Sequence, residues 1–250
     1  KGVGSLYTWG DSYHTSLGHT DLDPLYIPTK VTVQSRLPTE SEVTQYTLPY
    51  SRRNDAPLKS KFLKVATGPY HTACISEDYK LYTFGANNFN KLGHSYFYPQ
   101  QLGLVPAFRN SIVADAACGL DFTIVATDIG KVYTWGYGGT SKSILQTVFQ
   151  KVPPGALGHG DFLNYTYPTL VEGLSDIVQV AAGFHHSLAL AENGDLYSWG
   201  SNELGQIGHG DSQYEMRPQL LTRGISKISA AGNVSAALTC KSQMQPMAKF

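Results

Sequence analysis

This sequence is poor in cysteine, in charge and in long apolar runs. Its three cysteines, Cys74, Cys118 and Cys240, are too few and too scattered for a disulfide framework or a zinc site, which favours a reducing, intracellular compartment. Only 15% of the residues are charged, and 19 basic side chains balance 19 acidic ones. This balance argues against naked nucleic acid or an anionic membrane as the partner. No stretch approaches the roughly 18 consecutive apolar residues that a membrane span requires.

The chain begins at Lys1 without a methionine and enters strand-like residues almost at once. We therefore expect a processed or excised piece, and the lack of a targeting segment does not distinguish nucleus, cytosol and mitochondrion. A hydrophobic content of 42% and an aromatic content of 12% are enough for a substantial core, so a disordered chain is excluded.

An internal repeat is the strongest signal in the sequence. An aromatic motif occurs four times, as LYTWG at 6–10, LYTFG at 81–85, VYTWG at 132–136 and LYSWG at 196–200. An AxG motif ends at glycines 68, 119, 183 and 232, and an LGH or IGH motif has its glycine at 18, 93, 158 and 208. The first three AxG glycines each lie 16 residues before the aromatic residue of the next motif. Ordered markers at fixed spacing indicate a unit of about 50 residues.

Each repeat is predicted to consist of short antiparallel strands. HTACIS, TIVATD and HSLALAE alternate apolar or small residues with polar ones, as half-buried strands do. The Asn193-Gly194 pair predicts a two-residue hairpin turn with positive φ at both central residues. Pro28, Pro168 and Pro218 follow the marker histidines and are expected at edge strands. No amphipathic helix of 12 residues or more is apparent.

The fullest copy of the repeat, AAGxxHSLALxxNGDLYSWGSNxxGQIGHGD at 181–211, resembles the regulator of chromosome condensation (RCC1-type) repeat family. This resemblance implies an all-β fold, a β-propeller of which four blade units are visible, and 1–250 as a single propeller domain or an arc of a seven-bladed ring. The chain starts with the second half of a blade and ends with the first half of one, and these halves are complementary. Absent blades, an excised arc and an unusually small ring are the alternatives, of which the arc is favoured.

Two insertions interrupt the period. The first, 32–61, is polar and contains Arg52-Arg53, which is typical of a flexible loop on the propeller edge, with a partner-binding or processing segment as the alternative. The second, 137–157, combines apolar residues with lysines. An apolar loop on a regular scaffold is a candidate contact surface, and packing on the neighbouring blade is the alternative. Its candidate partner-binding residues are Lys142, Ile144, Phe149 and Lys151.

The histidines and tryptophans are explained by the repeat rather than by a catalytic or metal site. The histidines of the LGH motifs, at 19, 94, 159 and 209, are expected to hydrogen-bond the backbone in turns. His71 and His186 share a position at which Phe122 and Ser235 stand in the other copies. Trp9, Trp135 and Trp199 are expected in the blade core, and Cys74 and Cys118 are expected to be buried. No catalytic residues, no metal ligands and no cofactor are predicted.

The resemblance leaves two classes of function open. The first is a non-catalytic interaction or scaffold propeller that binds a protein partner through its blade loops. The second is a guanine-nucleotide exchange factor for a small GTPase, or a mitochondrial assembly factor of the same family. The founding member of the family places acidic residues directly after the AxG glycine, whereas Pro69, Leu120, Phe184 and Asn233 stand there in this chain. This departure weakens the exchange-factor alternative. The lack of a catalytic constellation favours a protein that is not an enzyme, and exchange-factor activity is left open.

Overall fold

The computed structural model describes residues 4–10, 17–18, 24–31, 61–94, 102–139 and 156–239, and these residues form an all-β structure. The only helical segments within these ranges are two short 3-10 turns, η1 (Asn88–Asn90) and η2 (Pro106–Phe108). Within the same ranges, no helix has the length and apolar character needed to cross a membrane.

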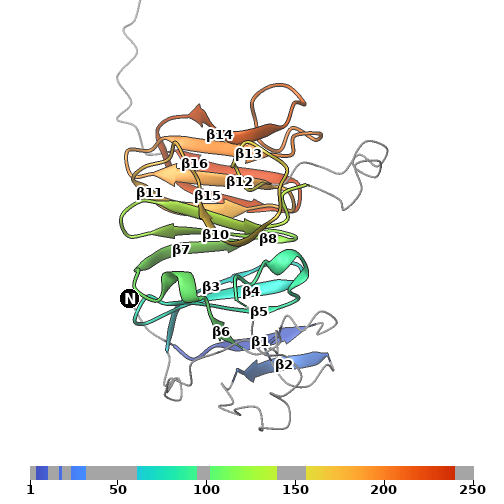
Figure 1. The fold of residues 1–250 in the computed structure, drawn as a ribbon, viewed down its shortest axis with the longest axis vertical. Helices are drawn as coiled ribbons and strands as arrows, with labels where there is room; N and C mark the ends of the chain where they lie inside the picture. Colours follow the sequence, from blue (N-terminus) through green and yellow to red (C-terminus); the bar gives the residue numbers. More distant parts are fainter. Residues whose placement is uncertain are drawn as a thin grey trace, which may run out of the picture.

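Three complete blades form the centre of the structure (Figure 1). Each is a four-stranded antiparallel sheet in which the strands follow one another in chain order. The strands of the first are β3 (Phe62–Thr67), β4 (His71–Ser76), β5 (Leu81–Gly85) and β6 (Gly103–Leu104). Those of the second are β7 (Val113–Cys118), β8 (Phe122–Thr127), β9 (Val132–Gly136) and β10 (Tyr165–Leu170). Those of the third are β11 (Ile177–Ala182), β12 (His186–Ala191), β13 (Leu196–Gly200) and β14 (Glu215–Thr222).

A two-stranded sheet flanks the complete blades on each side. One pairs β1 (Tyr7–Gly10) with β2 (Leu25–Lys30), and the other pairs β15 (Ile225–Ala231) with β16 (Val234–Thr239). β1 and β2 lie at the lower end in Figure 1, whereas β15 and β16 overlap the third blade in this view. The β1–β2 sheet corresponds to the two outer strands of a complete blade, and the β15–β16 sheet corresponds to the two inner strands. The described residues therefore form an open arc of blades, as the repeat pattern predicts.

Trp9 corrects the expectation that all three motif tryptophans are buried. Trp135 and Trp199 are completely buried, whereas Trp9 is 59% exposed. The reason is that Trp135 and Trp199 pack against the preceding blade, and the described residues include no blade before β1.

The hairpin turns also differ from the prediction. Gly194 has φ of +88°, but Asn193 does not have a positive φ, and the Gly194 amide donates to the Ala191 carbonyl at 3.0 Å. This combination is a type I turn followed by a left-handed residue that makes a bulge, not a two-residue turn with two positive φ values. Gly130 (φ +72°) and Tyr79 (φ +61°) occupy the same turn position in the other two blades.

Consecutive blades bury apolar side chains between them. Trp135 of β9 packs in a cluster with Ala73 and Ile75 of β4, and Trp199 of β13 packs in a cluster with Ile124 of β8. Trp135 and Trp199 thus each fill the boundary with the preceding blade. The prolines lie where they were expected, because Pro28, Pro168 and Pro218 are in β2, β10 and β14, the outermost strands of their sheets.

The innermost strands are connected by side chains at corresponding positions. Lys64 of β3 forms an ion pair with the buried carboxylate of Asp115 in β7 at 2.5 Å, and Asp115 accepts the Val180 amide of β11 at 3.1 Å. Gln179 of β11 donates to and accepts from the backbone of Ile228 in β15, at 2.9 and 3.0 Å. These four strands line a hollow of about 220 Å³, the position of the central channel of a propeller.

Candidate functional site

The LGH loop of each complete blade is hydrogen-bonded to the next blade. The carbonyl of Lys91 accepts the Thr123 hydroxyl at 2.7 Å and the Trp135 indole at 2.8 Å. One blade further on, the carbonyl of Ala156 accepts the Ser187 hydroxyl at 2.8 Å and the Trp199 indole at 2.7 Å. Both lone-pair positions of each carbonyl are thus occupied by donors from the neighbouring blade.

The glycine of each LGH loop makes room for this contact. Gly93 has φ of +70°, and a Cβ placed on it would lie 2.8 Å from the indole nitrogen of Trp135. Gly158, with φ of +83°, has the same relationship to Trp199. The motif therefore contains glycine for two reasons, the left-handed backbone and the close approach of the next blade.

His71 and His186 form further hydrogen bonds between blades. Their partners show that Ser235 does not occupy the histidine position of the repeat. His71 Nε2 lies 2.8 Å from the Thr123 hydroxyl, which donates to the Lys91 carbonyl, so the ring nitrogen is the donor. His186 lies 2.8 Å from the hydroxyl of Ser235, which donates to the Gln206 carbonyl at 2.7 Å. Ser235 is thus the counterpart of Thr123, not of the histidines. The turn after Gly232 is one residue shorter than in the other copies, which places Val234 at the histidine position.

The histidines of the LGH loops bond partly as expected. His94 Nε2 bonds the Thr83 carbonyl at 3.1 Å, as predicted, whereas His159 and His209 bond the hydroxyls of Thr134 and Ser198 at 2.9 and 3.0 Å. Burial lowers the pKa of His71 to about 3 and those of His94 and His186 to about 4. These three rings are therefore neutral structural groups at neutral pH.

One ion pair distinguishes the boundary between the first and second blades. The side chain of Lys91, where the other repeats have Ala156 and Gln206, is fully buried, and its ammonium bonds the Asp121 carboxylate at 2.5 Å. The ammonium also lies 5.2 Å from the centre of the Tyr70 ring. Burial lowers the pKa of Lys91, and the hydrogen bond and charge of Asp121 oppose that shift.

This ion pair lies at the end of the sheets that we call the loop face. The loop face consists of the turns 68–70, 119–121, 183–185 and 232–233 and the loops 86–94, 137–139, 156–164 and 201–214. Aromatic side chains on this face are accessible: Phe89 is 42% exposed and Phe184 38% exposed. The rings of Phe89 and Tyr137 are in contact, with centroids 4.8 Å apart. Burial and the nearby Asp121 charge raise the pKa of Tyr137.

The second insertion leaves the blade from this face. The Tyr137 amide donates to the Asp121 carbonyl at 2.8 Å, and the Gly138 amide donates to the side chain of Asn164 at 2.8 Å. A Cβ on Gly138 would overlap the Leu163 carbonyl oxygen. The first residues of the insertion are therefore held from both sides.

The four predicted site residues, Lys142, Ile144, Phe149 and Lys151, lie outside the described residues, as do 32–60 of the first insertion. Sequence reasoning missed Phe89, Lys91 and Asp121. Lys91 had a detectable signal, since a lysine replaces serine, alanine or glutamine at one repeat position.

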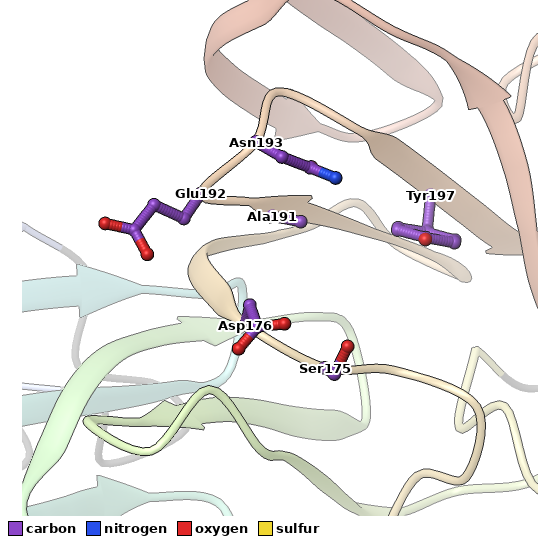
Figure 2. A pocket seen from close by; sticks show the side chains of 6 residues that line it. All are labelled: Ser175, Asp176, Ala191, Glu192, Asn193 and Tyr197. Atoms are coloured by element: carbon purple, nitrogen blue, oxygen red, sulfur yellow. The ribbon is translucent and has the colours of Figure 1, made fainter.

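The opposite end of the sheets carries a shallow hollow of about 310 Å³ (Figure 2). It is lined by Ser175, Asp176, Ala191, Glu192, Asn193 and Tyr197. In Figure 2 the Glu192 carboxylate points away from the Tyr197 ring, so the polar groups do not converge on one point. This arrangement does not resemble a catalytic site.

The described residues also contain no group of three or more His, Cys, Asp or Glu side chains arranged to hold a metal ion. Cys74 and Cys118 are buried, as predicted, and burial raises the pKa of both thiols. A raised pKa makes a thiol a poor nucleophile.

Comparison with known proteins agrees with the repeat and the blades. The family description "Regulator of chromosome condensation (RCC1) repeat" matches residues 154–190 and 193–238, and a second description with the same wording matches 177–206. Human E3 ubiquitin-protein ligase HERC2 is 28% identical over 97% of this chain. Residues 154–238 carry RCC1-type repeats.

Solved structures of RCC1-type propellers share the fold. Human WBSCR16 matches with a TM-score of 0.73 and 20% identity over 94% of this chain and 53% of its own. Yeast RCC1 (Prp20), solved in complex with Kap60, matches with a TM-score of 0.70 and 19% identity over 95% of this chain and 50% of its own. The chain thus spans about half the length of these two proteins and 4% of HERC2. Within the RCC1 fold, the LGH loops and AxG turns form the loop face on which Phe89, Lys91 and Asp121 meet.

Proposed function

We propose that this chain is part of an RCC1-repeat propeller that binds a protein partner through the loop face, without catalysing a reaction. The observation that carries the proposal is the group of exposed aromatic side chains on this face, on loops held by hydrogen bonds to rigid blades. Aromatic residues are enriched in protein interfaces, and loops on a rigid scaffold are the usual place for binding residues.

The second insertion extends this surface in our proposal. Its apolar residues Ile144 and Phe149 would be buried by the partner, at about 1.5–3 kcal/mol each, and Lys142 and Lys151 would form a polar rim. Support comes from the fixed start of the insertion at Tyr137 and Gly138, next to the exposed ring of Phe89.

A photo-crosslinking experiment tests the proposal. A photoreactive amino acid is placed at Tyr137 or Phe184 on the loop face, and at Ile129 or Tyr79 at the opposite end as matched exposed controls. After irradiation in cell extract, we expect one discrete protein adduct from the loop-face positions and none from the controls. Equal labelling from both ends would contradict the proposal.

The variant Phe149→Ser tests the part played by the insertion. We expect it to weaken the adduct while leaving the thermal midpoint nearly unchanged. A fall of several degrees in the midpoint with the adduct intact would mean that the insertion packs on its own blade.

Guanine-nucleotide exchange on a small GTPase is the second candidate function. It is favoured by an insertion directly after a YxWG-type strand, and by the fold shared with Prp20p of Saccharomyces cerevisiae, which has been studied for its binding to Gsp1p and histones. Asp121 is the one carboxylate in the four AxG turns, and it is paired with Lys91. Release of a fluorescent guanine nucleotide from a small GTPase, accelerated by this chain, is the deciding measurement. An intracellular location and a mitochondrial assembly role stay predictions.

A further inference from the structure

We propose that Phe89 is the anchor of the loop face and that the partner segment it holds is both apolar and basic. This inference rests on the proposed function, because it names the contact residue and the partner chemistry of the same face.

The first observation is the backbone of Phe89. Its φ is +60° and its ψ is +16°, in the left-handed region that side chains with a Cβ rarely adopt. A bulky residue in this region is strained, and such strain is concentrated at functional sites.

The turn itself does not require this strain at Phe89. The loops 87–92 and 202–207 have the same length, and in both an asparagine side chain accepts the amide five residues later, at 3.0 Å for Leu92 and 3.2 Å for Ile207. Both loops have a left-handed residue at the fourth position, Asn90 (φ +61°) and Gly205 (φ +74°). Leu204 corresponds to Phe89, and its φ is not positive.

The second observation is the position in which the strained backbone holds the ring. The Phe89 ring contacts Tyr137 at 4.8 Å and remains 42% exposed. A buried structural ring would be covered by its own chain, whereas this ring is presented to the outside beside a tyrosine. A rigid, half-exposed aromatic side chain is the type of residue that dominates binding energy in interfaces.

The third observation is the charge of the described loop face, which defines the partner. Its charged groups, leaving aside histidine, are four carboxylates and one ammonium: Asp121, Asp161, Glu203, Asp211 and Lys91. The ammonium is already paired with Asp121, and the guanidinium of Arg217 from β14 lies against Gly160 on the same face, so two carboxylates remain in excess. Burial lowers the pKa of His94, His159 and His185, so these rings do not offset the negative charge at neutral pH.

A basic partner is attracted by this excess of carboxylates, and its cations also interact favourably with exposed aromatic faces. Its apolar side chains cover the Phe89 and Tyr137 rings. We therefore infer a segment in which Arg or Lys alternates with aliphatic or aromatic residues.

A display library of random 12-residue peptides is the probe. Peptides selected on this chain are expected to be enriched in Arg or Lys together with apolar residues. Their Kd is expected to rise about 30-fold on both Phe89→Ala and Phe89→Asn, the loss typical of an interface anchor. Enrichment of acidic peptides, or unchanged affinity for the Phe89 variants, overturns the inference.

Thermal unfolding of the same variants separates an anchor from a structural residue. Asparagine and glycine tolerate a positive φ and alanine does not, so Phe89→Asn and Phe89→Gly are expected to unfold at or above the wild-type midpoint, and above Phe89→Ala. If all three variants unfold well below wild type, the ring is structural and the inference fails.

Tyr79→Gly is the matched control, since Tyr79 also has a positive φ, +61°, but lies at the opposite end of the blade. It is expected to raise the midpoint and leave peptide affinity unchanged. A loss of peptide affinity in this variant would place the binding site away from the loop face.

The outcomes separate this inference from the proposed function. Peptides that bind all Phe89 variants equally but lose affinity on Phe184→Ser overturn the anchor and leave loop-face binding standing. Loop-face crosslinking without any peptide enrichment overturns the basic, apolar partner chemistry. If neither loop-face crosslinking nor peptide enrichment is observed, the proposed function is overturned as well.

Discussion

The indole nitrogen of Trp135 donates a hydrogen bond of 2.8 Å to the backbone carbonyl of Lys91, across the boundary between two blades. Thr123 donates to the same carbonyl, and the arrangement recurs at Ala156 with Trp199 and Ser187. Apolar packing alone would allow blades to slide relative to one another. Two directed donors on one acceptor fix the boundary at a single point, which explains why tryptophan and a hydroxyl recur together in the repeat.

Replacing Trp135 with Phe is expected to lower the free energy of unfolding by about 2–3 kcal/mol, because one hydrogen bond and part of the buried indole volume are lost. Position 84 already holds Phe, so the blade core accepts this ring. Chemical denaturation measures the change. The double variant with Thr123→Val leaves the Lys91 carbonyl with neither donor, so its loss should exceed the sum of the single losses. A strictly additive result would contradict the shared-acceptor interpretation.

Gly93→Ala is expected to destabilise the chain by about 2 kcal/mol or more, since it combines a left-handed backbone with a Cβ 2.8 Å from the Trp135 indole nitrogen. Gly210→Ala is the matched control, because Gly210 has φ of +88° but open space around its Cβ position. Gly210→Ala should lower the free energy of unfolding by only about 1 kcal/mol, through backbone strain alone. Equal losses of thermal midpoint would mean that the close approach of Trp135 is unimportant.

Stability is expected to fall as the pH decreases from about 6.5 towards 4. His71, His94 and His186 have folded-state pKa values lowered to about 3, 4 and 4, so below pH 6.5 the unfolded chain binds more protons than the folded one. The neutral histidines contribute fully to the free energy of unfolding above their unfolded-state pKa of about 6.5. Below that pH, each histidine lowers the free energy of unfolding by up to about 1.4 kcal/mol per pH unit.

His71→Phe tests whether the histidines cause this loss of stability at acid pH. Phenylalanine is a suitable replacement because Phe122 occupies the corresponding position in the next blade. Between pH 6.5 and 5 the slope of unfolding free energy against pH should decrease by the contribution of one histidine. An unchanged slope would assign the acid sensitivity to other groups.

The Lys91–Asp121 pair is expected to be strongly coupled. Asp121→Asn leaves the buried ammonium without its counter-charge and should cost about 2–4 kcal/mol, while Lys91→Gln, which introduces the residue found at Gln206, should cost less. The double variant should be more stable than Asp121→Asn alone. If it is the least stable of the three in urea denaturation, the ion pair does not control this boundary.

Much of the fold was predictable because its determinants are local. Alternating apolar and polar residues define strands such as HTACIS, and glycines with positive φ define the LGH loops. Prolines that cannot donate a ladder hydrogen bond mark the outer strands at Pro28, Pro168 and Pro218. These properties depend on residues close in the chain, so a repeated spacing was enough to recover them.

The candidate site was less predictable. Asp121 and Tyr137 adjoin within the second blade, and Phe89 joins them only because the first blade packs on the second. The sequence indicated the insertion after Tyr137, but it gave no sign that Phe89 adopts a left-handed backbone, since the corresponding Leu204 does not.

The sequence by itself determined the repeat and the strand order within each blade, because hydrophobic alternation and turn glycines act over a few residues. The tertiary structure decided three other features: the exposure of Trp9, the place of Ser235 in the hydrogen bonds between blades, and the burial of the Lys91 ammonium against Asp121. Each depends on which neighbouring strand or turn lies alongside, and that neighbour is set by the packing of whole blades rather than by the local pattern.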